Sequence, residues 1–210
     1  MKRVGLLGGS FNPAHEGHLQ LSLAAIAALE LDQLWWLVSP GNPLKENAEM
    51  APYEARLESA REVARGTDIE VCDFERSAGT RYTIDTLRTI LEQYPDGKFI
   101  WLMGGDALVQ FHRWKDWRGI SQLVPIAVLP RPGYDDAAHA ARAMGWLSGF
   151  VRPASQAKNW TQWSLPALLF LDLPTNSASA TALRATDPDW HLRSRTEQRP
   201  GPLPGGSPPT

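Results

Sequence analysis

The sequence has very little cysteine and no long apolar run. Cys72 is the single cysteine among 210 residues, which excludes an internal disulfide and a cysteine-rich zinc site. No segment approaches the roughly 20 apolar residues that a membrane-spanning helix needs. The apolar residues that follow Lys2 and Arg3 are too few for the core of a signal peptide. We therefore expect a cytoplasmic protein that does not bind a membrane.

Neither sign of charge is in excess. The 21 Lys and Arg residues against 23 Asp and Glu residues leave a formal charge of -2, so bulk charge does not indicate a nucleic-acid partner. The length allows one domain with a substantial core. From residue 186 the composition changes, and the run 199–209 is rich in proline and glycine. We predict a domain over residues 1–185 and a flexible tail over 186–210.

Two familiar phosphate-binding patterns are missing. The sequence has no Gly-x4-Gly-Lys-Ser/Thr, which excludes a P-loop, and no Gly-x-Gly-x-x-Gly follows the first apolar run, which disfavours a nicotinamide-dependent dehydrogenase. His15 and His18 form a His-x-x-His pair that could bind a metal. Zinc would need two further ligands, and His112, His139 and His191 have no companion spacing. We predict no metal held by protein side chains.

Apolar runs alternate with helical patterns along the chain. Strands are predicted at 4–7, 34–38, 69–72, 98–103, 125–129 and 167–171, and helices at 19–29, 53–65, 83–94 and about 179–185. This alternation predicts an α/β fold with a doubly wound, mostly parallel sheet.

The most informative segment joins the first strand to the first helix. It reads Gly-Gly-Ser-Phe-Asn-Pro-Ala-His-Glu-Gly-His over residues 8–18. In an open α/β sheet this crossing lies at the carboxyl ends of the strands, where ligands bind. Glycines let backbone amides approach an anion, and the helix N-terminus adds partial positive charge. Because the two histidines can also donate to phosphate oxygens, the segment predicts a nucleotide site.

Two motifs resemble the signatures of the nucleotidyltransferase superfamily related to class I aminoacyl-tRNA synthetases. The first signature has the form Gly-x-Phe-Asp-Pro-x-His-x-Gly-His, and residues 9–18 match it with Asn12 in place of the aspartate. The second has the form Ser-x-Thr-x-x-Arg and matches residues 179–184. The two occur in the family's order. The resemblance implies a Rossmann-like fold that binds a nucleotide.

The middle of the chain resembles bacterial nicotinate-nucleotide adenylyltransferases. Residues 39–45 resemble their loop that ends in a phosphate-facing lysine, and 83–87 resemble their Thr-x-x-Thr-Leu helix start. Residues 99–106, 111–117 and 131–133 resemble their Gly-x-Asp segment, tryptophan helix and Arg-Pro-Gly. The resemblance covers roughly residues 2–185. It implies transfer of the adenylyl group of ATP to nicotinate mononucleotide, giving deamido-NAD and pyrophosphate in NAD biosynthesis.

The resemblance also implies which residues meet ATP. The catalytic set would be His15, His18, Lys45 and Arg184, and the other ATP contacts would be Gly8, Gly9, Ser10, Phe11, Gly104, Asp106, Ser179 and Thr181. Asp106 could bind ribose hydroxyls, or it could be only the N-cap of the next helix. Ser179 and Thr181 could cap the last helix. Mg²⁺ would arrive with ATP, without an assigned protein ligand.

The acceptor nucleotide would meet Asn42, Thr83, Trp114 and Arg131. Trp114 would stack on the pyridine ring, although core packing is an alternative role for any of nine tryptophans. Thr83 could be only a helix cap, and Arg131 only a surface charge. Lys115 stands where relatives often have tyrosine, and its ammonium could favour the pyridine carboxylate over a carboxamide. Exposed tryptophans could also form the interface of a homo-oligomer.

Two other interpretations stay open. One is another adenylyl- or cytidylyltransferase of the superfamily, such as phosphopantetheine adenylyltransferase. Those relatives share both terminal motifs but lack the Asn-Pro-Leu-Lys loop combined with a Trp-x-x-Trp helix. The other is a catalytically silent nucleotide-binding module. The intact set His15, His18, Lys45 and Arg184 argues against it.

Overall fold

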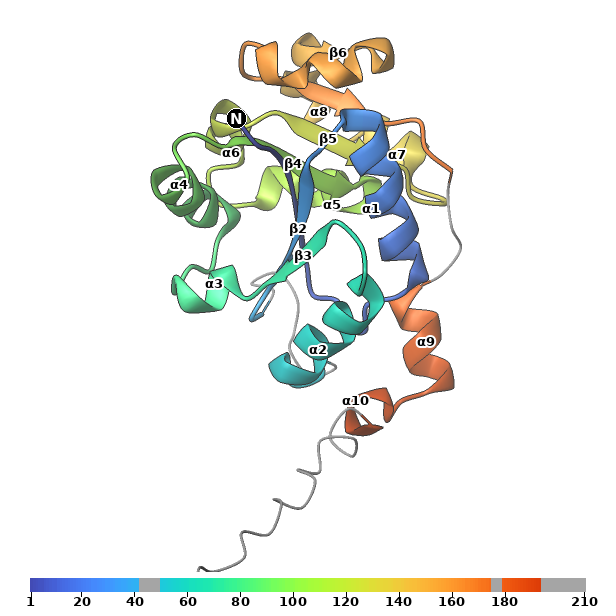
Figure 1. Cartoon of the computed structure of the whole chain (residues 1–210). Coiled ribbons are helices and arrows are strands. Elements are labelled where there is room, and N and C mark those ends of the chain that lie inside the picture. The colour runs from blue at the N-terminus through green and yellow to red at the C-terminus, as the bar shows by residue number, and fades with distance from the viewer. Residues whose placement is uncertain (42–49, 175–178, 194–210) are drawn as a thin grey trace, which may run out of the picture.

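A computed structural model describes residues 1–41, 50–174 and 179–193 (Figure 1). Seven strands form one sheet in the order β3-β2-β1-β4-β5-β7-β6, and every neighbouring pair is parallel. The strands are β1 (Arg3–Gly9), β2 (Gln33–Val38), β3 (Ile69–Cys72), β4 (Lys98–Gly104), β5 (Ile126–Leu129), β6 (Val151–Arg152) and β7 (Leu168–Phe170). The predicted doubly wound α/β fold is confirmed.

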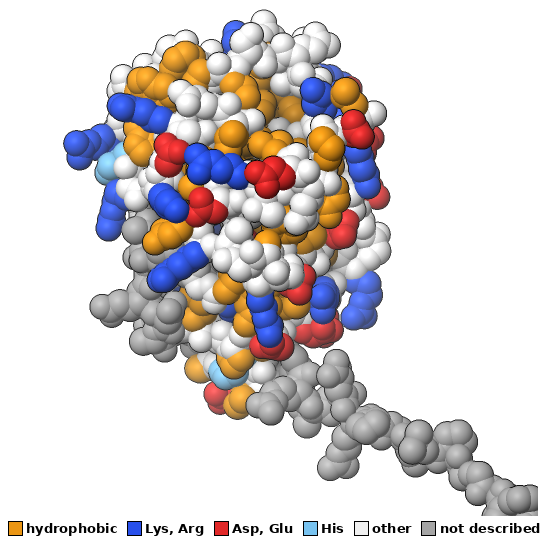
Figure 2. All heavy atoms as spheres, turned by 90° about the vertical axis from the view of Figure 1, so that its left-hand side faces the viewer, with side chains coloured by type: hydrophobic (Ala, Val, Ile, Leu, Met, Phe, Trp, Pro, Cys, Tyr) orange, Lys and Arg blue, Asp and Glu red, His pale blue; other side chains and the backbone are white. Residues whose placement is uncertain are grey.

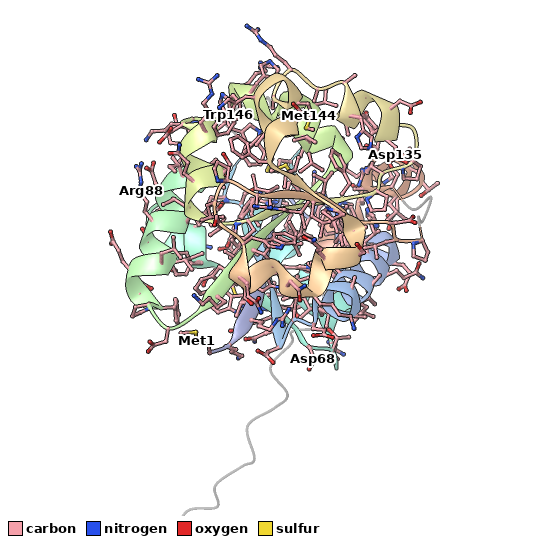
Figure 3. The ribbon with its side chains drawn as sticks, turned by 90° about the horizontal axis from the view of Figure 1, so that it is seen from above. Met1, Asp68, Arg88, Asp135, Met144 and Trp146 are labelled. Carbon is pink, nitrogen blue, oxygen red and sulfur yellow. The ribbon has the colours of Figure 1, made fainter. Side chains whose placement is uncertain are left out.

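Helices cover both faces of this sheet. One face packs against α1 (Glu16–Leu29), α2 (Tyr53–Ala64) and the 3-10 segment η4 (Ala154–Gln162). The other packs against α4 (Thr83–Gln93), α5 (Gly105–Gln110), α6 (Trp117–Leu123), α7 (Asp135–His139) and α8 (Met144–Leu147). Figure 3 shows Met144 and Trp146 of α8 on the opposite side of the molecule from Met1 and Asp68. The remaining elements are α3 (Phe74–Ser77), η2 (Phe111–Arg113), η3 (Ser148–Phe150), α9 (Ala180–Thr186) and α10 (Trp190–Arg193).

The central strands are apolar on both faces because both faces are covered. Successive side chains of a strand point to opposite faces, so Trp101 and Met103 of β4 join one core while Ile100 and Leu102 join the other. Such strands read as continuous apolar runs, which is the pattern that predicted them from the sequence. The packed sheet therefore supports the loops at its edge.

The order of the strands places a ligand site at one edge of the sheet. From β1 the chain adds β2 and β3 on one side, and then crosses to add β4 on the other side. The loops after β1 and β4 thus leave the sheet at a topological switch point, where open α/β folds bind ligands. The chain starts near the top of Figure 1, and α9 lies at the opposite, lower end.

Several short elements differ from the sequence-based expectation. All six predicted strands are present. The seventh strand, β6, was not predicted, because its two residues are too few to give a periodic signal. Helix α1 begins at Glu16 rather than at residue 19, because His15 is its N-cap. Helix α9 extends to Thr186, and α10 lies inside the segment predicted as a tail. The domain boundary at residue 185 stays a prediction, and residues 194–210 lie outside the described chain.

The surface carries charges of both signs. Figure 2 shows acidic and basic side chains interspersed on the face that forms the left-hand side of Figure 1, where α4 and α6 lie. Within the described ranges, no helix combines the length and apolarity that a membrane span requires.

Candidate active site

A cavity of about 400 Å³ opens where β1 and β4 end, a size typical of small-molecule sites. Its walls come from the segments that follow β1, β2, β3, β4 and β5 and from the start of α9. The predicted site residues that line it are Gly8, Gly9, Ser10, Phe11, His15, His18, Thr83, Gly104, Asp106, Trp114, Arg131, Ser179, Thr181 and Arg184. Two further predicted residues, Asn42 and Lys45, lie outside the described residues.

The two histidines of the first motif lie side by side at the start of α1. Their ring centroids are 3.8 Å apart, and His18 Nδ1 accepts a hydrogen bond of 3.2 Å from the backbone N–H of His15. Because Nδ1 accepts, the neutral ring of His18 carries its proton on Nε2, a donor. His15 is 6% exposed, and neither of its ring nitrogens has a hydrogen-bond partner among the described residues. Buried polar atoms without partners indicate a place for a polar ligand.

Burial keeps both rings neutral. Burial, together with the smaller effect of the positive charge of Arg131, lowers the pKa of His15 to about 4. Burial likewise lowers the pKa of His18 to about 3, with contributions from His15 and Arg131. A polyphosphate entering the cavity would oppose this effect, since an adjacent anion favours the protonated imidazole.

Phe11 shapes the turn between β1 and α1. Its φ of +46° lies in the left-handed region, which bulky residues rarely adopt. The ring is buried and stacks on Trp36 at 4.8 Å, with His18 5.1 Å away. Core packing thus compensates for the unfavourable backbone. The aromatic ring belongs to the core, so the backbone of Phe11 is the part suited to meet an anion.

Three glycines of the site lie close to neighbouring side chains. A Cβ on Gly8 would lie 2.7 Å from the ring of Trp101, and a Cβ on Gly104 would lie 2.5 Å from Oδ1 of Asp106. A Cβ on Gly9 would meet the ring of Phe11 at 3.1 Å. Gly8 therefore admits a core tryptophan beside the loop, and Gly104 makes room for a carboxylate on the cavity wall.

The side chains of Asp106 and Arg131 lie close together in the wall of the cavity. The Arg131 Nε lies 3.9 Å from Asp106 Oδ1, and both side chains are partly exposed. Gly104 is the N-cap of α5, and Asp106 lies within the first turn, so the N-cap role considered for Asp106 is wrong. Arg131, for which a plain surface charge was the alternative, is partly exposed, lines the cavity and lowers the pKa of both histidines.

The second motif docks on the first. Ser179 is the N-cap of α9 and accepts from the N–H of Ala182 at 3.4 Å, as predicted. The cap role is wrong for Thr181, whose hydroxyl instead accepts from Arg184 Nη2 at 3.4 Å. Arg184 Nη1 donates to the backbone carbonyl of Asn12 at 2.7 Å. This bond fixes one end of the guanidinium while the side chain lines the cavity.

Trp114 packs against the core, as considered, and also lines the cavity; stacking on the pyridine ring stays a prediction. Its half-buried ring meets Trp101 and Phe111 edge-on, with centroids 6.3 Å and 5.4 Å apart, and it also lines the cavity. The helix-cap alternative for Thr83 is wrong, because Tyr82 holds the N-cap position of α4 and no side chain caps that helix.

Lys115 lines the same part of the cavity. Its ammonium pairs with Asp85 at 2.8 Å and lies 4.7 Å from the centre of the Tyr82 ring. Asp85 therefore already neutralises part of the positive charge of Lys115, the charge that was expected to favour the pyridine carboxylate.

Sequence reasoning missed two buried ionisable groups near the site. Glu75 lines the cavity, and burial raises the pKa of its carboxyl to about 7. Arg56 is buried behind the cavity, where it bonds to the backbone of Ser10. Neither belongs to a short motif, so no sequence signal distinguished them from ordinary helix charges. The described residues contain no cluster of three or more His, Cys, Asp or Glu side chains that could hold a metal ion.

Comparison with known proteins agrees with this geometry. Residues 6–186 match the family model described as cytidylyltransferase-like. A protein of Erythrobacter litoralis named "Probable nicotinate-nucleotide adenylyltransferase" is 55% identical, over 92% of this chain and 89% of its own length. A relative of the same name from Parvibaculum lavamentivorans is 49% identical, over 91% of this chain and 94% of its own length. The solved Plasmodium falciparum nicotinic acid mononucleotide adenylyltransferase complexed with NaAD has a TM-score of 0.64 at 15% identity, over 88% of this chain and 83% of that chain.

The parallel sheet and the two joined motifs at its switch point define the class of protein, a nucleotidyltransferase. The chain belongs to the cytidylyltransferase-like family and, within it, groups with the nicotinate-nucleotide adenylyltransferases.

Proposed function

We propose that this chain transfers the adenylyl group of ATP to the 5′-phosphate of nicotinate mononucleotide, forming deamido-NAD and pyrophosphate. The observation that carries the proposal is that one cavity unites both nucleotide motifs with the acceptor-side residues Thr83 and Trp114. Relatives about half identical along nearly the whole chain bear the name of this activity.

The protein must position the two substrates and stabilise the charge that develops during the reaction. A phosphate oxygen of the acceptor attacks the α-phosphorus of ATP, and the bond from that phosphorus to the bridging oxygen breaks toward pyrophosphate. The nucleophile is already an anion near neutral pH, so it needs no strong general base. Holding two anions in line and stabilising the charge on the leaving group accounts for the acceleration.

The residues around the first motif suit the ATP phosphates. His18 presents an Nε2 donor, and among the described residues neither ring nitrogen of His15 has a hydrogen-bond partner. Arg184 lines the same cavity and adds a positive charge with several donors. Lys45 belongs to this set by resemblance alone. Backbone groups of residues 8–11 and the side chains of Ser179 and Thr181 complete the proposed contacts.

Mg²⁺ enters this proposal as part of the substrate Mg-ATP. Magnesium keeps several waters and binds readily through substrate phosphates. No protein ligand is assigned to it in this proposal.

The acceptor and the adenosine take the remaining walls. Trp114 offers an aromatic face for the pyridine ring, and Thr83 and Arg131 offer donors to its carboxylate and phosphate. Asp106, whose carboxylate is partly exposed in the cavity, suits ribose hydroxyls. Asn42 is assigned to the acceptor by resemblance alone.

The test is pyrophosphate release from Mg-ATP and nicotinate mononucleotide by the wild type and by His18→Ala. We expect deamido-NAD as the product and a loss in kcat of about 100-fold or more in the variant, the usual effect of removing a donor to developing charge. His191→Ala, on α10 and outside the cavity lining, is the matched control and should keep wild-type turnover. Unchanged turnover in His18→Ala would contradict the proposed site.

A further inference from the structure

Arg56 is a buried cation that the proposed mechanism does not use. It lies on α2 and is 1% exposed, and burial lowers the pKa of its guanidinium. Within the described ranges no carboxylate lies at ion-pair distance from it. A buried charge is costly unless it is paired or well hydrogen-bonded, so its partners must account for its presence.

Those partners are backbone carbonyls from three separate segments. Nη1 donates to Ser10 at 2.7 Å and to Ser39 at 2.8 Å, Nη2 donates to Pro40 at 3.3 Å, and Nε donates to Ala51 at 3.1 Å. Ser10 belongs to the loop after β1, Ser39 and Pro40 follow β2, and Ala51 precedes α2. One rigid guanidinium therefore joins the ends of two neighbouring strands to the helix behind them.

The bond to Ser10 fixes the orientation of a peptide at the cavity. In a planar trans peptide the N–H points away from the C=O, so holding the Ser10 carbonyl toward Arg56 turns the Phe11 N–H to the opposite side. Phe11 is also the residue held at φ +46°. The same loop is tied to β2 because the N–H of Ser39 donates to the carbonyl of Gly9 at 2.9 Å. Ser10, Phe11 and Ser39 all line the cavity.

We propose that Arg56 is a positioning residue that holds the Ser10–Phe11 peptide in the orientation that receives an ATP phosphate. This rests on the proposed function, because it assigns the loop after β1 to ATP. Arg56 itself touches no substrate. Its effect reaches the reaction through the backbone, and it should concern ATP more than the acceptor nucleotide.

The test compares Arg56→Lys and Arg56→Gln with Arg61→Lys, an exposed arginine on the same helix. Lysine keeps the charge and the aliphatic stem but loses the fork that reaches several carbonyls at once. Circular dichroism and the thermal midpoint first establish that each variant is folded. Calorimetry then gives the ATP affinity without acceptor, and steady-state kinetics give kcat and both KM values.

We expect kcat/KM for ATP to fall about 10- to 100-fold in Arg56→Lys, the scale on which misplaced catalytic geometry acts. The KM for nicotinate mononucleotide should stay within about twofold, and Arg61→Lys should match the wild type. Arg56→Gln, which lacks the charge, should lose at least as much. ATP affinity and kcat/KM for ATP within about twofold of the wild type in folded Arg56→Lys would overturn the proposal, and so would equal increases in the two KM values.

Two further outcomes are also decisive. Unfolding of both Arg56 variants, with Arg61→Lys folded, would make Arg56 a purely structural residue and would overturn the positioning role. A wild type that binds ATP but does not turn over nicotinate mononucleotide would refute the proposed function. The calorimetric ATP affinities of the variants would then still decide the role of Arg56.

Discussion

Arg184 Nη1 donates a 2.7 Å hydrogen bond to the backbone carbonyl of Asn12, joining residues 172 positions apart in the sequence. The bond connects the second signature motif to the first at the mouth of the cavity. It uses the carbonyl of Asn12, while the side-chain Oδ1 of Asn12 accepts from the N–H of Ala51 at 3.1 Å. An aspartate oxygen could accept the same bond, which explains how asparagine can replace the family's aspartate here.

Replacing Arg184 should separate the two motifs and remove a charge from the cavity. We expect Arg184→Ala to lower kcat/KM for ATP by about 10- to 150-fold, since charged hydrogen bonds contribute about 1.5–3 kcal/mol. Arg184→Lys should recover part of this loss, because lysine keeps the charge without the second donor arm. Steady-state kinetics with Arg142→Ala, an exposed arginine away from the cavity, provide the control. Equal kinetics for Arg184→Ala and the wild type would refute a role for Arg184 at the phosphates.

The two histidines should make the ligand-free protein sensitive to acid. Their pKa values of about 4 and about 3 in the folded state lie below the ordinary 6.5, so the unfolded chain takes up protons first as pH falls. Their contribution to stability is complete above about pH 6.5 and is lost as pH falls toward the folded pKa values. The raised pKa of Glu75 acts in the opposite direction in this range, because the folded state then takes up the proton first. The histidines should therefore lower the thermal midpoint at about pH 5 relative to about pH 7, against the smaller opposing effect of the single Glu75 carboxyl.

The double variant His15→Gln/His18→Gln should lose the acid destabilisation, since glutamine does not titrate, and keep only the opposing dependence that Glu75 contributes. His191→Gln, outside the cavity, should keep the wild-type slope. Thermal midpoints measured across this range without nucleotide give the comparison. If the double variant kept the full slope, acid sensitivity would have to come from other groups.

Much of this architecture could be predicted from the sequence because it depends on local patterns. Strands such as β4, covered on both faces, form continuous apolar runs, and the residues of 8–18 identify the phosphate loop. The short helices α5, α6, α7 and α8 could not be predicted, because one or two helical turns give no usable period. Arg56 was missed for a different reason. Its partners are backbone carbonyls of distant segments, and carbonyls leave no trace in the sequence.

Substitution of Gly8 should destabilise the protein, because the space beside this residue is filled by Trp101. The added methyl of Gly8→Ala would meet the buried ring of Trp101 at 2.7 Å, which in turn contacts Trp114 edge-on. We expect the free energy of unfolding to decrease by about 1–3 kcal/mol, as in other overpacked cores. The KM for the acceptor should also rise, since Trp114 must shift. Urea unfolding and kinetics measure the two effects.

Gly145→Ala is the matched control, because a Cβ there has no atom within 4 Å and the residue lies in α8. It should be neutral or stabilise the protein by up to about 1 kcal/mol, the helix preference of alanine over glycine. Similar unfolding free energies for the two variants would show that Trp101 can move aside with no loss of stability.

Lys115 remains the candidate for selectivity toward the pyridine carboxylate. Its ammonium already pairs with Asp85, and both side chains are partly exposed. We therefore expect Lys115→Ala to reduce the preference for nicotinate over nicotinamide mononucleotide by no more than about fivefold, the scale of an exposed charge pair. The ratio of kcat/KM for the two acceptors measures this change. An unchanged ratio would show that selectivity arises elsewhere in the cavity.

The central claim is tested most directly by pyrophosphate release from Mg-ATP with three acceptors, namely nicotinate mononucleotide, nicotinamide mononucleotide and phosphopantetheine. We expect fast turnover with nicotinate mononucleotide, with deamido-NAD identified as the product by mass spectrometry. Turnover with phosphopantetheine alone, or ATP binding without pyrophosphate release from any of the three, would contradict the account.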